Sequence, residues 1–571
     1  DITEIIHLKD FVQIVDDESW GEFMPKGLRK ALFLDILRYY DEDVVIGAGL
    51  RIRKMAKAAD ELPPTYRAKR IVEIMSKFKN PDKETVLTPW RVVNMHMGNT
   101  LGGYNFFDES FQKELEDPRV IDNGEITSDI LLNTDAKVLE MNSKSGLYPL
   151  YLAYSFYMLN VSGKEKDLPL ETTQKIWFDT LDKHIFVLCK TKMARMITIR
   201  TLAGYSKNNV HAIYLTKLVE ERMKDLDRLS KKLTNPETWN IGGDRMKFDA
   251  VVGNPPYQLE VGKTFNQTQS NTTWIYQYFQ FVADKVGKYT CLIYPFGGWF
   301  DSPDRLNGLG NAILHDGHTI SISAYEGTTD KRAWYRNDKE PDPIFGTSAN
   351  LSAGISIVLR SNKIHDSFEF MNRVYADKKV IVKFSETESI PPNPLFIEIN
   401  KKLTGKKFVK DVKKGIFGIE SNFVELNPLK VSPTADSWEY PIQLLTNDKS
   451  GSSGRAKLFW TDKKNIPSGQ EFFDYYKVVI SSASPKKSIT TGDPTIENVI
   501  KRMGELVEVL QPNSAFGKSR MALYMTKSKE ECDNFLKYIR TKFFAGLVLQ
   551  EPNRRSTIGE IIPAQDYSNN S

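Results

Sequence analysis

The sequence of 571 residues has little cysteine, and Cys189, Cys291 and Cys532 lie far apart without a CxxC pair. This scarcity excludes a disulfide framework and a cysteine-rich zinc site, and it favours a reducing compartment such as the cytoplasm. The sequence also has no run of about 18 apolar residues, which argues against a membrane span. We find no secretory leader at its start, and we expect no metal site.

Motifs for nucleotide hydrolysis and DNA cleavage are missing as well. Gly517-Lys518-Ser519 resembles the end of a phosphate-binding loop, but Pro512 stands where that loop needs its first glycine. We find no convincing carboxylate–lysine cluster of a nuclease. A motor or nuclease activity is therefore not expected from these residues.

The first 400 residues have no excess of positive charge, and the excess lies in the remaining residues. Residues 401–571 hold 27 Lys and Arg against 19 Asp and Glu, whereas the preceding 400 residues are slightly acidic. A basic module suggests a polyanionic partner, because each neutralised phosphate releases counterions. An ordinary solvated surface explains the charge equally well.

The length predicts two or three packed units, because single cores rarely exceed about 300 residues. Residues 1–84 show the apolar spacing of helices and nothing that looks catalytic. Residues 85–400 alternate short apolar runs with longer amphipathic ones, which predicts an α/β sheet covered by helices. The runs that predict buried strands are Lys137–Met141, Ile185–Cys189, Phe248–Val252, Tyr289–Tyr294 and Gly354–Arg360.

Residues 401–571 form a different, mixed α+β region of turns, short strands and two late helices. Apolar side chains at helical spacing predict one helix over Ile496–Leu510. A second helix is predicted to begin at Ser528, with Glu531 completing a capping box.

The most informative motif is Asn254-Pro255-Pro256-Tyr257, which follows Gly253 at the end of a predicted strand. Open α/β sheets bind ligands at the carboxyl ends of their strands. Methylating an aryl amine is difficult because its lone pair is delocalised, and acceptors aimed at both N–H bonds make the nitrogen more nucleophilic. The side-chain oxygen of Asn254 and the carbonyl of Pro255 can supply such acceptors, and Tyr257 can stack on a base flipped out of a duplex. The alternative is a simple Asn-Pro-Pro turn.

This tetrapeptide resembles the catalytic motif of the N6-adenine DNA methyltransferases of bacterial restriction–modification systems, in which cofactor motifs come first and a recognition domain last. The resemblance implies a doubly wound, Rossmann-like fold, S-adenosylmethionine as cofactor and double-stranded DNA as partner. It implies direct transfer of a methyl group to a flipped adenine. The same tetrapeptide occurs in methyltransferases that act on protein glutamine, so it indicates the chemistry better than the substrate.

The resemblance also implies cofactor-binding residues before the catalytic motif. Residues 137–147 read as a strand, a turn of small residues and the start of a helix, similar to the family's first cofactor motif but with a single glycine. The contacts expected here are Glu140, Asn142, Ser143 and Gly146. Residues 87–93 resemble the family's Thr-Pro segment, so Thr88 is expected near the methionine part of the cofactor; a helix cap is the alternative.

Three further positions are interpreted through the family. Cys189 ends the second predicted strand where an acidic residue normally holds the cofactor ribose, so another group does this or the cofactor is held weakly. Asp244 resembles the acid that pairs with the adenine amine of the cofactor, although a turn aspartate fits equally well. Phe345 precedes a strand where the family carries an aromatic that stacks on the flipped base; the alternative is a core side chain.

Residues 401–571 resemble, more loosely, the recognition domains of such enzymes. Lys and Arg on their strands and loops can fix phosphates while other side chains read base edges. The chain most resembles the methylase and recognition portion of large single-chain restriction–modification proteins. We therefore expect a helical coupling segment over 1–84, a methyltransferase domain over 85–400 and a recognition domain over 401–571, with nuclease and helicase domains or subunits outside this chain.

Two alternatives remain open. The chain can be a methyltransferase acting on protein glutamine or on RNA. It can also be a catalytically silent methyltransferase fold that serves a defence assembly as its DNA-recognition module, a reading motivated by the single Gly146 and by Cys189.

Overall fold

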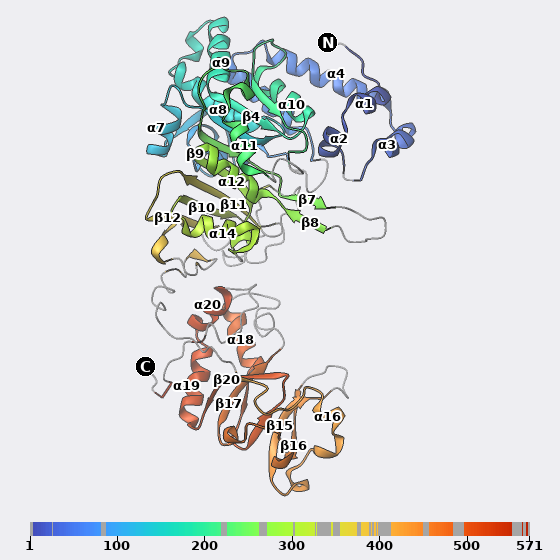
Figure 1. Ribbon diagram of the computed structural model, residues 1–571, viewed down its shortest axis with the longest axis vertical. Coiled ribbons are helices and arrows are strands. Elements are labelled where there is room, and N and C mark those ends of the chain that lie inside the picture. Colours follow the sequence, from blue (N-terminus) through green and yellow to red (C-terminus); the bar gives the residue numbers. More distant parts are fainter. Residues whose placement is uncertain are drawn as a thin grey trace. The chain divides into compact units, whose positions relative to one another are not determined.

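The computed structural model describes two compact units, which divide after Glu388 and are coloured blue to yellow and orange to red in Figure 1. The residues that the structure describes fall into separate ranges along the chain. These ranges are 4–25, 27–80, 87–218, 225–261, 271–300, 303–325, 327, 344–345, 354–373, 378–386, 390, 393–394, 397, 413–448, 456–482, 496–550, 562 and 567–568.

A nine-stranded sheet in the order β13-β12-β10-β11-β9-β6-β3-β4-β5 forms the centre of the first unit. Strands β5, β4, β3, β6 and β9 are parallel, whereas β11 is antiparallel to both β9 and β10. The expected α/β fold with a doubly wound sheet is thereby confirmed. The strands are β3 (Val138–Ser143), β4 (Ile185–Cys189), β5 (His211–Tyr214), β6 (Phe248–Gly253), β9 (Gly287–Pro295), β10 (Thr319–Tyr325), β11 (Ile355–Ser361), β12 (Ser367–Asn372) and β13 (Val380–Lys383).

Helices cover both faces of this sheet, because parallel neighbours need crossover connections of one hand. α8 (Leu147–Asn160), α9 (Leu170–His184) and α10 (Lys192–Ala203) connect β3 to β4 and β4 to β5, and they pack against these strands. α11 (Leu226–Leu233) and α12 (Tyr276–Val286) lie in the connections on the other side of β3, where α12 packs against β6 and β9. α14 (Arg305–His315) follows β9.

Strands that are buried on both faces were the easiest elements to predict. β4 has the predicted bounds, and β3, β6, β9 and β11 differ from prediction by one or two residues at an end. All residues of β3, β4 and β11 are buried, which explains their uninterrupted apolar runs. α12 begins only at Tyr276, because Trp274 pairs with Gln258 in a hairpin of β7 (Gln258–Val261) and β8 (Asn271–Trp274).

Helices precede the sheet, as predicted, and belong to the first unit. α2 packs against α10, and Figure 1 shows α1 to α4 beside that helix. α5 packs against α8 and α9, and α6 packs against α8. The helices are α1 (Leu8–Ile14), α2 (Asp17–Phe23), α3 (Lys30–Ile36), α4 (Glu42–Ala59), α5 (Pro64–Ser76), α6 (Trp90–Gly98) and α7 (Glu125–Leu131), with the hairpin β1 (Gly103–Phe107) and β2 (Glu114–Ile121) between the last two.

The second unit has two small sheets, in the orders β14-β20-β17-β18 and β16-β15-β19. The helix predicted over Ile496–Leu510 was too long: α18 ends at Leu506, and Glu508–Leu510 form β18, which pairs with β17. The alternating Val507-Glu508-Val509-Leu510 suits an edge strand better than a helix end. The other elements are β14 (Lys413–Lys414), α16 (Phe423–Leu426), β15 (Pro441–Asn447), β16 (Ala456–Asp462), β17 (Tyr476–Ser481), α18 (Ile496–Leu506), β19 (Ser514–Phe516), β20 (Arg520–Thr526), α19 (Lys529–Ile539) and α20 (Lys542–Gln550).

Candidate active site

The Asn-Pro-Pro-Tyr motif begins directly after β6, between the ends of β3 and β9. Gly253, the last residue of β6, has a φ of +144°, and a Cβ added there would lie 2.5 Å from the carbonyl oxygen of Met141 in β3. Only glycine allows the two strands to approach this closely. This approach brings Asn254 to the end of β3.

Asn142, near the end of β3, contacts Asn254 from the neighbouring strand. It has a φ of +69°, in the left-handed region, and the pairing of β3 with β4 shifts register around it. Its side-chain Nδ2 donates a hydrogen bond of 3.1 Å to the main-chain oxygen of Asn254. Because β4 and β6 flank β3 on opposite sides, this contact lies at the switch point of the sheet, the usual place for a ligand.

Thr88, in the segment before α6, also contacts Asn254. Nδ2 of Asn254 donates a 3.0 Å hydrogen bond to Oγ1 of Thr88, whose residue is only 9% exposed. Thr88 does not cap α6, because the N-cap residue is Pro89. Thr88, Asn142 and Asn254, widely separated in the sequence, are thus joined by hydrogen bonds.

Four buried polar atoms of this region have no hydrogen-bond partner among the described residues. They are Oδ1 of Asn254, Oδ1 of Asn142, Oε2 of Glu140 and the hydroxyl oxygen of Tyr257. An unsatisfied buried polar atom costs about 1–3 kcal/mol, so a group of them is expected where a ligand supplies the missing partners. Asn254 and Tyr257 are themselves half-buried and remain partly accessible.

Glu140 is a buried acid on β3 with no ion pair among the described residues. Its residue is 5% exposed, and burial raises the pKa of Glu140 to about 8 despite a hydrogen bond from Ser143 that lowers it. The carboxyl group is therefore mostly uncharged at neutral pH. A cationic group bound beside it would favour the charged form and lower this pKa.

Tyr257 belongs to a group of aromatic rings behind the motif. Its ring meets Tyr276 edge-on with centroids 6.4 Å apart, and Tyr276 stacks on Tyr294 at 5.1 Å. Phe345 is 4% exposed and packs in the main core, and the carbonyl of its neighbour Ile344 accepts a 3.0 Å hydrogen bond from Arg91 of α6. Such burial fits a core side chain, and stacking of Phe345 on a base stays a prediction.

The loop after β3 is tied to α10. Oγ of Ser143 lies 2.9 Å from Oγ1 of Thr198, and Oγ1 of Thr201 donates a 2.6 Å hydrogen bond to the carbonyl of Ser145. Gly146 has a φ of +76°, and a Cβ there would lie 3.1 Å from Cα of Thr198. Close packing of the loop on α10 thus requires this glycine, and its contact with a cofactor stays a prediction.

Asp244 is not brought together with the other candidate residues. It is exposed and precedes the amino end of β6, whereas Asn254 follows the carboxyl end. A strand of this length spans about 20 Å, so the two residues lie at opposite edges of the sheet. The position is that of a turn aspartate, and it corrects the expectation that Asp244 reaches the cofactor edge.

The structure reveals two buried contacts that the sequence did not indicate. His96 of α6 lies 2.7 Å from the hydroxyl of Tyr148 and 2.9 Å from Sγ of Cys291, and burial lowers the pKa of His96 to about 3, so it stays neutral. Glu22 of α2 accepts a 2.6 Å hydrogen bond from Oγ1 of Thr191, just after β4. No local pattern links residues so far apart in the sequence, so only the fold could find them.

Two features are absent from the residues that the structure describes. These residues contain no group of three or more His, Cys, Asp or Glu side chains arranged to hold a metal ion. None of their helices combines the length and the apolar character that crossing a membrane requires.

Comparison with known proteins gives one match to a family model: residues 183–330 match Eco57I restriction-modification methylase. A search of the curated proteins found no match. The solved structures that match include the methyltransferase subunit of the type I restriction-modification system from Streptococcus thermophilus, with 11% identity, 59% of this chain and 57% of that chain covered, and a TM-score of 0.32.

Two further solved structures match over most of this chain. They are the DrdV–DNA complex, with 11% identity, 94% of this chain and 61% of that one covered and a TM-score of 0.41, and the type IIG restriction endonuclease BpuSI, with 10% identity, coverages of 91% and 62% and a TM-score of 0.38. The chain thus spans less than two thirds of each of these three proteins.

The family match covers the strands on both sides of β3 and the Asn-Pro-Pro-Tyr motif, whereas Thr88, Glu140 and Asn142 lie before it. Residues 183–330 include β4, β6 and β9, together with the motif at Asn254–Tyr257. The resemblance read from the sequence is therefore confirmed over residues 183–330, which match the restriction-modification methylase family model.

Proposed function

We propose that this chain is a site-specific DNA methyltransferase that transfers a methyl group from S-adenosylmethionine to N6 of adenine. The observation that supports this most is the state of the Asn254 amide. Its Nδ2 is engaged by Thr88, while its Oδ1 is buried without a hydrogen-bond partner among the described residues. A hydrogen-bond acceptor held in this way suits an exocyclic amine, which brings N–H donors.

The residues at the end of β3 fit S-adenosylmethionine by their chemistry. Unpartnered oxygens on Glu140 and Asn142 offer acceptors for the ammonium group of its methionine part. Glu140 is a buried acid with no cation beside it among the described residues, so a cationic ligand would lower its raised pKa. When bound, the cofactor supplies an electrophilic methyl group on a sulfonium.

In the proposed mechanism, the chain positions the base and raises the nucleophilicity of its amine. Asn254 Oδ1 and the Pro255 carbonyl accept hydrogen bonds from the two N–H groups of N6. Tyr257 stacks on the flipped ring, and the two prolines hold the loop rigid. Thr88 keeps the Asn254 amide in the orientation that presents oxygen to the base. Asn254 and Pro255 would hold the amine in line with the methyl group that the cofactor supplies; the sulfur–methyl bond would break with S-adenosylhomocysteine as the leaving group, and the extra proton of the amine would leave to water.

Double-stranded DNA is the proposed partner, and the second unit is the proposed recognition domain. The support is the charge of residues 401–571, with 27 basic against 19 acidic residues. In this proposal residues 1–84 couple the methyltransferase domain, residues 85–400, to nuclease and helicase domains or subunits outside this chain.

The test is transfer of a tritiated methyl group to duplex DNA, RNA and protein offered in parallel, followed by identification of the modified base. We expect label in duplex DNA as N6-methyladenine at one sequence. Label in protein glutamine or in RNA instead would refute the proposal in favour of another substrate for the same chemistry.

A catalytically silent recognition module is the second candidate. Cys189 favours it, since this residue is fully buried at the strand end where an acidic group is expected. Calorimetry with S-adenosylmethionine separates the two, because a silent module gives no binding heat while it still binds DNA.

A further inference from the structure

The carboxyl end of β4 lacks an acidic residue of its own. Cys189 is fully buried, and its Sγ lies 3.9 Å from Oγ1 of Thr198. Burial raises the pKa of Cys189, so the thiol stays protonated and is a weak hydrogen-bond acceptor. Nucleotide ligands of such sheets are normally held here by an acid that accepts from the ribose hydroxyls.

An acid does reach this strand end, but from the N-terminal helices. Glu22 is 5% exposed, and its Oε2 accepts a 2.6 Å hydrogen bond from Oγ1 of Thr191, two residues after β4. Thr191 in turn caps α10 by accepting from the main-chain N of Ala194 at 3.2 Å. Glu22 and Glu140 both add to the effect of burial on the pKa of Cys189, so the two acids lie near the thiol.

The remaining oxygen of Glu22 is not used by the fold. Among the described residues, Oε1 accepts no hydrogen bond and Glu22 forms no ion pair. Oε1 is not among the fully buried unpartnered atoms, so it remains accessible to solvent. One oxygen is thus anchored and the other remains available to a ligand.

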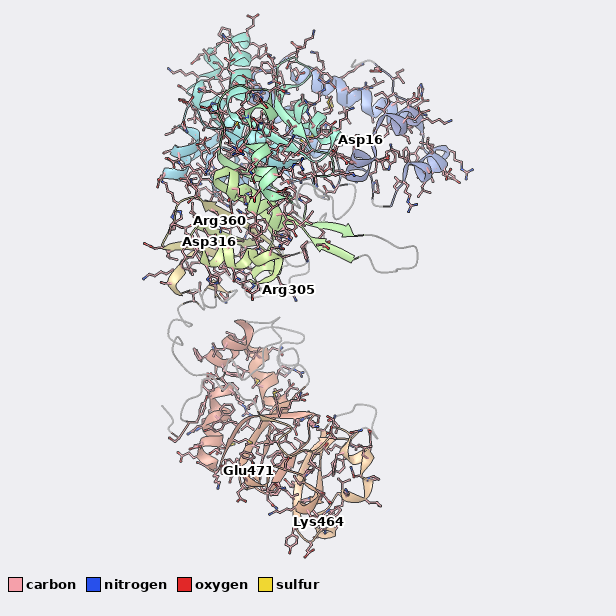
Figure 2. The ribbon with its side chains drawn as sticks, viewed as in Figure 1. Asp16, Arg305, Asp316, Arg360, Lys464 and Glu471 are labelled. Carbon is pink, nitrogen blue, oxygen red and sulfur yellow. The ribbon has the colours of Figure 1, made fainter. Side chains whose placement is uncertain are left out.

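The helix that carries Glu22 is fixed across two strand ends. Oγ of Ser19 accepts from the main-chain N of Met193, after β4, at 3.1 Å, and Oε1 of Glu18 accepts from the main-chain N of Lys217, after β5, at 3.1 Å. Figure 2 labels Asp16, the N-cap residue of this helix, in the N-terminal group of helices. These contacts place Glu22 rigidly, as a ligand-binding group requires.

We propose that Glu22 supplies the acceptor for the ribose hydroxyls of the cofactor, in the place where β4 ends in Cys189. The inference rests on the proposed use of S-adenosylmethionine and adds the residue that holds its sugar. It makes the N-terminal helices part of the cofactor site. A structural role in which Glu22 only braces Thr191 is the competing explanation.

The test measures binding of two ligands to the full chain by calorimetry. These ligands are S-adenosylhomocysteine and its analogue without the 2′ and 3′ hydroxyls. The unaltered chain is expected to prefer the natural ligand by about 10- to 100-fold, the range for hydrogen bonds to a charged group. Glu22→Ala should weaken S-adenosylhomocysteine by that factor and leave the analogue unchanged, so the preference disappears.

Asp17→Asn is the matched control, because it removes an acidic charge from the same helix at an exposed side chain that makes none of the contacts with the ends of β4 and β5, and it should keep the full preference. If Glu22→Ala does not fold, Glu22→Gln, of nearly equal volume, should still reduce the preference severalfold. Equal weakening of both ligands, or an unchanged preference in both Glu22 variants, would show a bracing role and overturn the assignment. If the unaltered chain binds neither ligand, the proposed function fails and this inference with it.

Discussion

Two buried charged residues of the same sheet, Arg360 on β11 and Glu140 on β3, differ in how the fold compensates them. Arg360 is 3% exposed, and its guanidinium lies 2.6 Å from Oδ2 of Asp316 and 3.2 Å from Oδ2 of Asp284. Figure 2 labels Arg360 and Asp316 side by side. Glu140 is equally buried, but no cation among the described residues pairs with it.

The electrostatic consequences are opposite. Burial alone would lower the pKa of Arg360, but Asp284 and Asp316 raise it, so the charge is kept. Burial raises the pKa of Glu140 to about 8, so its charge is lost at neutral pH. Removing one partner of a compensated buried pair is strongly destabilising, whereas an uncompensated buried acid with a shifted pKa marks a candidate binding site.

The largest expected effect is at the neighbouring unpartnered amide. Asn254→Ala removes the acceptor for the amine, and we expect methyl transfer to duplex DNA to fall by about 100- to 1000-fold, as when a strong transition-state hydrogen bond is deleted. Tyr257→Ala should be similarly inactive. Filter binding of the target duplex should remain measurable in both. Activity retained in both variants would contradict the assigned roles.

A change at Arg360, the compensated residue, should lower the stability of the fold rather than the activity. Arg360→Met leaves two carboxylates without their partner, and because these are partly exposed we expect a loss of about 3 kcal/mol in the free energy of unfolding. Urea unfolding measures this loss, and turnover per folded molecule should be unchanged. Glu140→Gln is the matched variant and should not be destabilised at pH 8. A comparable loss of stability in both variants would erase the distinction between these sites.

A smaller effect is expected from the residue that orients the amide. Thr88→Val deletes the hydrogen bond to Nδ2 of Asn254, and the rate of single-turnover methyl transfer should fall about tenfold with little change in DNA affinity. Thr88→Ser keeps the hydroxyl and should keep the rate. An equal loss in the serine variant would point to packing rather than orientation.

The smallest expected effect is on the number of protons released when the cofactor binds. With a pKa of about 8, Glu140 is about 90% protonated at pH 7, and a bound cation lowers that pKa, so cofactor binding should release about 0.9 proton. Calorimetry in buffers of different ionisation enthalpy measures the release, and Glu140→Gln should lack it. An identical proton count in the two proteins would place the cation elsewhere.

The same shift affects the protein without ligand. The pKa of Glu140 is higher in the folded chain than the ordinary value of 4.5. Its contribution to stability is therefore complete below about pH 4.5 and is lost as the pH rises through 8.

Local patterns predicted the parts of the fold that local physics determines. The strand Ile185–Cys189 and the cap at Ser528, which accepts from the main-chain N of Glu531, are both found where predicted. The hairpin after Tyr257 and the strand Glu508–Leu510 depend on pairing partners and were not predicted. Tertiary pairing overrides local propensity in such segments.

The candidate site likewise has a part that the sequence predicted and a part that it did not. Glycine and proline spacing identified Asn254–Tyr257 and the loop at Gly146, because backbone constraints are visible in the sequence. Glu22 was not found, because it reaches the end of β4 through the docking of a helix 170 residues earlier. Asp244 was misplaced, since its spacing from the motif did not reveal the edge of the sheet on which it lies.

The left-handed backbone at Asn142 limits which residue can occupy that position. Glycine would relax the main chain there and is expected to raise stability, yet it would remove the amide that holds the Asn254 carbonyl. A larger β-branched residue would lose both the conformation and the contact. Position 142 is therefore a compromise between folding and chemistry, and asparagine is the side chain that serves both.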